Sequence, residues 1–323
     1  MQPCSPTRGC VFRRDYGSLT CDVPPSETSR WRAIARVLRS PMDAVSCALL
    51  PAFCSLCGFP LPRFSSTPIC AVCWTEIPVL DGAVCARCAN PLEPAAPPGA
   101  LCRACRLAPP PFVCAAAYGL YHGRMRAAIH ALKYDRLHPA SRQLGCFLAQ
   151  AIARLAPEAP GELLVVPVPL HRSKYVQRGF NQARSLAAEA IACLRKTHPG
   201  WRLTLAASTL MRLRATGSQA GLTPRQRRLN VRGAFSVAHA AAVAGKHVLL
   251  VDDIFTTGAT ARAASLALLQ AGAVSVRIAT LARACRLRGA DPDASTTALE
   301  NRPGDGAQAL SAPSFSLHGQ PSF

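Results

Sequence analysis

The amino-acid sequence predicts an α/β protein with a parallel sheet, preceded by a small zinc-binding domain. Short apolar runs alternate with helical segments between residues 112 and 285, which is the pattern of parallel strands joined by helices. Four Cys-x-x-Cys pairs lie between residues 54 and 105, with the spacing of tetrahedral zinc sites. Hydrophobic residues make up 50% of the 323 residues, which is enough for a substantial core.

The α/β region alternates strands and helices along the chain. Strands are expected in the first part of 114–137 and then at 163–170, 203–213, 246–253 and 275–283. Helices are expected in the second part of 114–137 and then at 141–155, 181–195 and 259–273. Met125, Ile129 and Leu132 recur at helical spacing, and Gly272 is placed to cap the last helix.

The four cysteine pairs predict two structural Cys₄ zinc sites. The pairs are Cys54/Cys57, Cys70/Cys73, Cys85/Cys88 and Cys102/Cys105. Two thiolates on one tight turn supply one edge of a tetrahedral site, and a second pair completes it. The simplest assignment takes the pairs in sequence, while a cross-braced assignment, redox dithiols and an iron–sulfur cluster stay open. The remaining eight cysteines, among them Cys146 and Cys193, have no matching partners and are expected in the core or at the surface.

Two segments outside the organised region are expected to be poorly ordered. Residues 1–45 show no sustained periodicity, and residues 286–323 are polar and rich in small side chains. Between them we expect a double zinc ribbon at 50–108 and the α/β domain at 112–285. Met42 stands just before the organised region and is an alternative start to Met1.

The chain is strongly basic, with 37 Lys and Arg against 17 Asp and Glu and a formal charge of +20. This balance favours anionic partners such as phosphates, nucleic acid or an anionic membrane surface, although a general bias toward arginine produces the same charge. No apolar run reaches about 18 residues, and the N-terminus lacks a compact apolar signal segment. We therefore expect a cytoplasmic protein whose ordered cysteine pairs bind metal rather than form disulfides.

Two adjacent aspartates follow the apolar run 248–251 in the stretch VLLVDDIFTTGAT. Ligands of parallel sheets bind beyond the carboxyl ends of the strands, which is where Asp252 and Asp253 are expected. A small-residue turn then leads into a helix, and backbone N–H groups at a helix N-terminus bind phosphate. The turn residues are Thr256, Thr257, Gly258, Ala259 and Thr260. The two carboxylates can accept hydrogen bonds from hydroxyls or hold Mg²⁺ through water. Beside a phosphate-binding turn they indicate a phosphorylated sugar as the ligand. The alternative is that Asp253 caps a helix and Asp252 pairs with a nearby arginine.

The same stretch resembles the phosphoribosyl-pyrophosphate (PRPP) motif of type I phosphoribosyltransferases. The resemblance implies that Asp252 and Asp253 contact ribose hydroxyls and that residues 256–260 hold the 5′-phosphate. Other segments are similar, in order, to the competence protein F (ComF) family: the paired ribbons, YHGRMRAAIHALKYDR, VPVPLHRSKYVQRGFNQARSLA and RLRATGSQAGLTPRQRRLNVRGAF. The similarity covers about residues 50–284 and implies a type I phosphoribosyltransferase-like sheet after a double zinc ribbon.

Two basic segments add counter-charges for a pyrophosphate. Arg172 and Lys174 follow a strand that ends at the carboxyl edge of the sheet, where type I transferases hold pyrophosphate, so we predict both as catalytic residues beside the two aspartates. The loop 212–232 carries six arginines and resembles the mobile loop that closes over PRPP and excludes water. A solvated basic surface or a nucleic-acid contact is the alternative for this loop.

The resemblance implies that the protein transfers phosphoribosyl from PRPP, with Mg²⁺ bound to the pyrophosphate. The sequence does not identify the acceptor. The resemblance also links the protein to DNA uptake during natural transformation. Tyr118, Tyr121 and Phe180 are candidates for stacking on an acceptor ring, although core roles are as typical of such residues. The alternative is a non-catalytic protein that senses PRPP or another nucleotide and binds single-stranded DNA. A third hypothesis is an adaptor whose ribbons bind other competence proteins.

Overall fold

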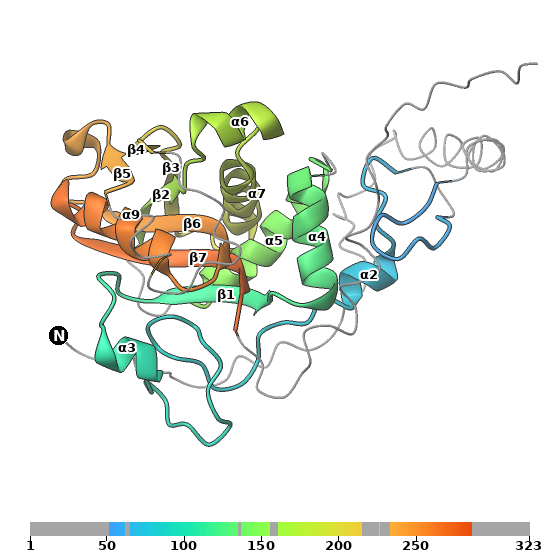
Figure 1. Ribbon diagram of the computed structural model, residues 1–323, viewed down its shortest axis with the longest axis horizontal. Coiled ribbons are helices and arrows are strands. Elements are labelled where there is room, and N and C mark those ends of the chain that lie inside the picture. The colour runs from blue at the N-terminus through green and yellow to red at the C-terminus, as the bar shows by residue number, and fades with distance from the viewer. Residues whose placement is uncertain are drawn as a thin grey trace, which may run out of the picture. The chain divides into compact units, whose positions relative to one another are not determined.

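The computed structural model of the protein describes residues 52–61, 65–134, 137–155, 161–214, 226 and 233–285 (Figure 1). The extension expected at 1–45 and the tail expected at 286–323 lie outside these residues, and so does most of the arginine-rich loop. Within the described segments, none of the helices combines the length and the apolar character needed to span a bilayer.

The central sheet of the described chain has five strands (Figure 1). They are β1 (Ala115–Leu120), β2 (Glu162–Pro167), β3 (Arg202–Leu205), β6 (His247–Phe255) and β7 (Ser275–Arg283). Their order across the sheet is β1-β7-β6-β2-β3, and every neighbouring pair is parallel. The predicted α/β class is therefore confirmed, and β6, which carries both aspartates, is the central strand.

Helices cover both faces of the sheet, which is why its central strands are apolar on both sides. The helices are α4 (Gly123–Tyr134), α5 (Ala140–Ala153), α7 (Gln182–Thr197) and α9 (Ala259–Gln270). On β6, Leu249 and Val251 belong to the core cluster that contains α5 and α7. Val248 and Leu250 belong to the cluster that contains α9. The side chains of this strand thus alternate between two cores, one on each face of the sheet.

A short helix that the sequence pattern does not reveal, α6 (Arg172–Arg178), follows β2. None of its residues is buried, so it lacks the apolar periodicity by which a helix is predicted. The side chain of His171 accepts a hydrogen bond from the N–H of Ser173 and caps the start of the helix. Gly179 ends it with a φ of +79°, a left-handed conformation that favours glycine.

The segment 203–213, predicted as one strand with its flank, contains two strands in the structure, which corrects the prediction. The second and its partner are β4 (Leu210–Arg212) and β5 (Phe235–Val237), which form a separate antiparallel pair. A turn separates β3 from β4, and in it the N–H of Thr209 donates to the carbonyl of Ala206. The sequence hides this turn because it contains neither glycine nor proline.

Cys146 on α5 and Cys193 on α7 form a disulfide, which corrects the expectation that these cysteines have no partners. They are 47 residues apart along the chain, so no local spacing signals the pair. The two helices pack closely at Gly145, where an added Cβ would lie 2.3 Å from the Cβ of Glu189. This packing brings the Cα atoms of the two cysteines to 5.7 Å, within the usual range for a disulfide.

The cysteine-rich region folds as two copies of one small unit. Each copy begins with a hairpin that one antiparallel bridge closes, Phe53 with Pro60 in the first and Val84 with Pro91 in the second. Each copy ends in a helix of five residues, and these helices are α2 (Ala71–Thr75) and α3 (Arg103–Leu107). One cysteine pair lies on the hairpin and the other at the helix, so the repeat brings four thiols together.

Candidate functional site

The eight predicted zinc ligands assemble into two tetrads with the sequential pairing, which excludes the cross-braced alternative. The tetrads are Cys54, Cys57, Cys70 and Cys73, and Cys85, Cys88, Cys102 and Cys105, each with its four sulfur atoms within 4.8 Å of one another. The sulfur atoms of Cys54 and Cys73 are 3.8 Å apart, and those of Cys88 and Cys102 are 3.6 Å apart. Tetrahedral zinc with Zn–S bonds of about 2.3 Å has edges of about 3.8 Å. Both tetrads therefore fit a closed, structural Zn²⁺ site.

The two aspartates lie near the carboxyl end of β6, and the carboxyl group of each makes contacts within the protein. Lys133 of α4 places its Nζ 2.7 Å from Oδ2 of Asp253, and Nε2 of Gln182 on α7 donates to the same oxygen at 3.0 Å. The backbone N–H of Asp253 donates to Oδ1 of Asp252 at 2.9 Å. These three contacts use one oxygen of each carboxyl group, Oδ2 of Asp253 and Oδ1 of Asp252.

Four basic side chains act on this acidic pair. Lys133 is in direct contact, and the charges of Lys174, Arg178 and Arg212 also reach one or other aspartate. Burial, and then the neighbouring charge of Arg212, hold the pKa of Lys174 below its ordinary value, as expected where cations crowd together. Four cations against two carboxyl groups leave an excess of positive charge, which attracts a polyanionic ligand.

The two carboxyl groups differ in protonation. Burial raises the pKa of Asp252 to about 7, and the charge of Asp253 adds to this effect. Burial also opposes ionisation of Asp253, but the charge and hydrogen bond of Lys133 and the bond from Gln182 outweigh it and hold the pKa of Asp253 below its usual range. Asp253 is therefore ionised throughout the physiological range, whereas Asp252 titrates near neutral pH.

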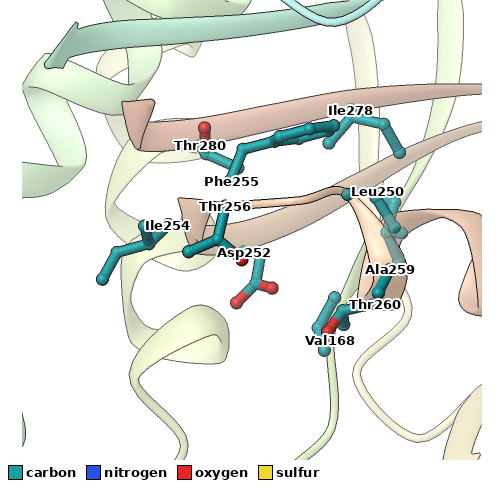
Figure 2. Close-up of a pocket in the computed structure, with 12 residues that line it drawn as sticks. Val168, Leu250, Asp252, Ile254, Phe255, Thr256, Ala259, Thr260, Ile278 and Thr280 are labelled. Carbon is teal, nitrogen blue, oxygen red and sulfur yellow. The ribbon is translucent and has the colours of Figure 1, made fainter. Parts of the chain in front are cut away.

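The loop between β6 and α9 forms a pocket beside Asp252. Figure 2 shows the Asp252 carboxylate between Thr256 on one side and Thr260 and Val168 on the other. Helix α9 starts behind Gly258, which as N-cap offers no side chain to the first-turn N–H groups. No capping side chain therefore competes with an anion for these donors.

Gly258 is required at the turn of this loop. Its φ is +74°, and an added Cβ would lie 2.7 Å from the ring of Phe255. Any other residue would strain the backbone and also push the ring aside. The sequence pattern Thr-Thr-Gly thus reflects a tight turn closed over an aromatic ring.

The structure distributes the predicted site residues unevenly. The pocket is lined by Asp252, Thr256, Gly258, Ala259 and Thr260, whereas Thr257 lines a separate cavity on the side of the second ribbon. Lys174 lies partly buried on α6, within electrostatic reach of Asp253. Arg172, in the first turn of the same helix, is exposed. The roles of these residues in binding and catalysis stay predictions.

Lys133, Arg178 and Gln182 are site residues that the motif-based prediction does not include, whereas Arg212 is one of the six arginines of the predicted loop. The sequence could have indicated Lys133 as a site residue, because it stands four residues after Ile129 on an otherwise apolar helix stripe. Its side chain is only 15% exposed, and a buried lysine needs a partner. Gln182 stands at the start of α7 behind the N-cap Asn181, where sequence alone gives no reason to expect a contact with β6.

The exposed aromatic side chains are not those considered for stacking. The ring of Tyr118 lies in the core, 2% exposed and stacked on Phe147 at 4.4 Å. Tyr134, next to Lys133, is instead 55% exposed, and Tyr175 on α6 is 49% exposed. The guanidinium of Arg178 lies 5.2 Å from the centre of the Tyr134 ring. An aromatic and basic surface therefore lies beside the acidic pair.

Comparison with known proteins agrees with both parts of the fold. A double zinc ribbon domain model matches residues 45–106, and a phosphoribosyl transferase domain model matches residues 203–301. The chain is 31% identical over 239 residues to the DNA utilization protein YhgH of Salmonella typhi. The aligned region covers 72% of this chain and 98% of that protein.

Two relatives named for competence match a shorter part of the chain. Competence protein F of Haemophilus influenzae is 32% identical over 121 residues, or 37% of this chain and 50% of that protein. Competence protein ComFC of Bacillus subtilis is 33% identical over 123 residues, or 37% of this chain and 44% of that protein. With the two cysteine tetrads ahead of a parallel sheet that carries the acidic pair, these similarities show that the chain belongs to the competence protein F family, with a double zinc ribbon joined to a type I phosphoribosyltransferase domain.

Proposed function

We propose that the protein binds PRPP with Mg²⁺ in the pocket at the carboxyl end of β6 and transfers phosphoribosyl to an acceptor. The observation that carries this proposal is the charge pattern: four cations surround two carboxyl groups next to an uncapped helix N-terminus. A ribose diol bridges the oxygens of Asp252 and Asp253, the α9 turn takes the 5′-phosphate, and the excess cations take the pyrophosphate. We assign this role to the domain at 112–285 in a cytoplasmic protein.

The chemistry follows from the placement of charge. A bond forms from the acceptor nucleophile to the anomeric carbon while the bond from that carbon to the pyrophosphate oxygen breaks. Pyrophosphate leaves with the electron pair, and the acceptor releases its proton. Lys174 and Arg178 stabilise the negative charge that grows on the leaving oxygen. Mg²⁺ bound to pyrophosphate would neutralise further charge, and Asp252 is the carboxylate available to hold it through water.

Replacing Asp252 with asparagine is expected to weaken PRPP binding about 100-fold, because a charged acceptor of the ribose hydroxyls is lost. Calorimetric titration of Mg²⁺–PRPP into the zinc-loaded protein measures this effect. The titration is best made at pH 8, where Asp252, with a pKa of about 7, is ionised. An Asp252→Asn/Asp253→Asn double variant is expected to lose binding altogether.

Pyrophosphate alone provides the control for this experiment. It has no ribose hydroxyls, and each asparagine removes a negative charge from a site with an excess of cations, so the variants should bind pyrophosphate at least as tightly as the wild type. Equal weakening of both ligands would point to misfolding, and absence of PRPP binding to the wild type would overturn the proposal. Pyrophosphate release during an acceptor screen then tests turnover.

A second candidate function, single-stranded DNA binding, is favoured by the exposed rings of Tyr134 and Tyr175 and by the guanidinium of Arg178, which lies against Tyr134. Aromatic rings with guanidinium groups bind single strands by stacking and by contacts to phosphate. The relatives are named for DNA utilization and for competence, and we extend that link to this chain as part of the proposal. In this case PRPP is a signal rather than a substrate.

Tyr134→Ala is expected to weaken binding of an oligothymidylate about tenfold or more, since stacking contributes about 1–3 kcal/mol per base. Fluorescence anisotropy at increasing salt measures the affinity, which should fall steeply as counterions compete. Trp201→Ala supplies a control, because this aromatic stands just before β3 and belongs to neither α4 nor α6. Absence of binding at low salt, or equal loss in both variants, would remove this function from consideration.

A further inference from the structure

Arg283, the last residue of β7, connects the second ribbon to the loop that forms the pocket. The residue is 7% exposed. Toward the ribbon, Nε donates to the carbonyl of Cys88 at 3.0 Å and Nη2 donates to Oδ1 of Asn90 at 3.2 Å. Toward the loop, Nη1 donates to the carbonyl of Phe255 at 2.9 Å and also to the carbonyl of Thr256. One guanidinium thus donates hydrogen bonds both to the predicted zinc ligand Cys88 and to the start of the loop between β6 and α9.

A second set of contacts runs between the same two elements. Arg87, between the two cysteines of the ribbon hairpin, donates to the carbonyl of Phe112 at 3.2 Å. The ring of Phe112 meets the ring of Phe255 edge to face at 6.0 Å. The guanidinium of Arg283 lies 4.7 Å from the centre of that Phe255 ring. Because the Phe255 ring occupies the space where Gly258 would carry a side chain, its position sets the shape of the turn.

A cavity lies on this side of the loop. It has a volume of about 240 Å³, separates the loop from the ribbon and is lined by Asn90, Arg103, Thr257, Arg262 and Arg283, among others. The Oγ1 of Thr257 is buried and has no hydrogen-bond partner among the described residues. A backbone segment that faces a cavity is fixed by its few remaining contacts. At the start of the loop those contacts include the ones made by Arg283 and Phe255, while in the first turn of α9 Arg262 donates to the carbonyls of Pro109 at 2.9 Å and of Ala108.

We propose that Arg283 is a positioning residue that couples the second zinc ribbon to the phosphate-binding loop, so that the ribbon holds the loop in the shape that accepts a 5′-phosphate. This inference rests on the proposed function, because it assigns residues 256–260 to that phosphate. It gives the ribbon a role within the same chain, in addition to any outside partner. Reciprocity follows, because a ligand that fixes the loop must also stabilise zinc in the second tetrad by the same factor.

Arg283→Gln and Asn90→Ala test the coupling from its two sides, with ribose 5-phosphate and pyrophosphate as separate probes. Arg283→Gln should weaken ribose 5-phosphate binding about tenfold, within the usual range of coupling between sites, while pyrophosphate affinity stays within about twofold of wild type. Asn90→Ala should give a smaller loss of the same kind. Arg283→Lys, which keeps the charge without the fork, should recover part of the affinity.

Arg277→Gln is the matched control, because Arg277 is another 7% exposed arginine of β7, at the far end of the strand, where it donates to Ser275. Both glutamine variants should lower the melting temperature, but only Arg283→Gln should lose ribose 5-phosphate. Zinc content should remain two per chain in each. Equal ribose 5-phosphate affinity in Arg283→Gln and wild type would overturn the coupling.

Hydrogen exchange separates a failure of the coupling from a failure of the proposed function. Amides in a peptide spanning 255–262 should exchange faster in Arg283→Gln than in wild type or Arg277→Gln, with no ligand present. If this holds and the wild type binds no ribose 5-phosphate, the coupling stands and the proposed function fails. Unchanged exchange in Arg283→Gln would overturn the coupling whatever ligand binds.

Discussion

Replacing Lys133 with methionine is expected to lower the free energy of unfolding by about 3–5 kcal/mol, because it leaves a buried carboxylate without its charge partner. The side chains of Lys133 and Asp253 are only 15% and 7% exposed. Methionine keeps most of the apolar stem of lysine, so the loss reports the charge rather than a cavity. Urea unfolding at pH 7, followed by circular dichroism, measures the change.

The pH dependence of this loss follows from the directions of the two pKa shifts. The pKa of Asp253 lies below its ordinary value, so its contribution is present above about pH 4 and disappears as the carboxylate is protonated at lower pH. The pKa of Lys133 is raised: burial opposes its charge, but Asp253 outweighs burial. Its contribution is therefore present below about pH 10 and is lost in more alkaline solution. The destabilisation should be present between these limits, grow as Asp252 ionises near pH 7, because Lys133 also lowers the pKa of that carboxyl group, and shrink outside them.

A double variant and a surface control identify the cause. Lys133→Met/Asp253→Asn removes both charges and should recover much of the stability lost in Lys133→Met. Lys196→Met, at an exposed position in the last turn of α7, should change the free energy of unfolding by less than about 0.5 kcal/mol. If Lys133→Met unfolds with wild-type stability, the ion pair does not hold α4 to β6.

Removing zinc is the second change with a large expected effect, since structural zinc contributes about 10–16 kcal/mol to small zinc domains at pH 7. Cys85, Cys88 and Cys105 belong to the same buried cluster as Val248 and Leu250 of the central strand. Loss of the second zinc should therefore reach beyond the ribbon and lower the melting temperature of the α/β domain. Treatment with a strong chelator, followed by calorimetry, measures this effect.

Single substitutions show which cysteines are responsible. Cys88→Ser should reduce the zinc content from two ions per chain to one, as measured by atomic absorption, because three thiolates bind zinc much more weakly than four. Cys285→Ser is the control, since Cys285 is a free cysteine outside both tetrads. Full zinc content in Cys88→Ser, or a lost ion in Cys285→Ser, would contradict the ligand assignment.

The parts of the fold that the sequence predicts are those with a local signal. The Cys-x-x-Cys pairs and the apolar run before Asp252 are short patterns whose physical meaning does not depend on distant residues. The order of strands in the sheet, the Cys146–Cys193 disulfide and the Lys133–Asp253 pair all join segments far apart in the chain. Spacing along the sequence carries no information about such contacts until the topology is known.

The same distinction holds within the candidate site. The acidic pair and the Thr-Thr-Gly turn belong to one continuous motif and are predicted together. Gln182 and Arg283 reach the site from α7 and β7, and each looks like an ordinary helix or strand residue by sequence. Helix α6 escapes prediction because all of its residues are at least partly exposed, although it brings Lys174 into range of the aspartates.

The strand order has a consequence for how the chain is made. In the described part of the chain, β1 pairs only with β7, and β7 is the last strand to be synthesised. While the ribosome translates the more than 150 residues between Leu120 and Ser275, β1 has no neighbour to complete its hydrogen bonds. Each ribbon can bind zinc as soon as its four cysteines emerge, but the sheet cannot close until nearly the whole domain has left the exit tunnel. Nascent chains of this protein therefore carry β1 without its neighbour until β7 has been made, and they depend on that strand to complete it.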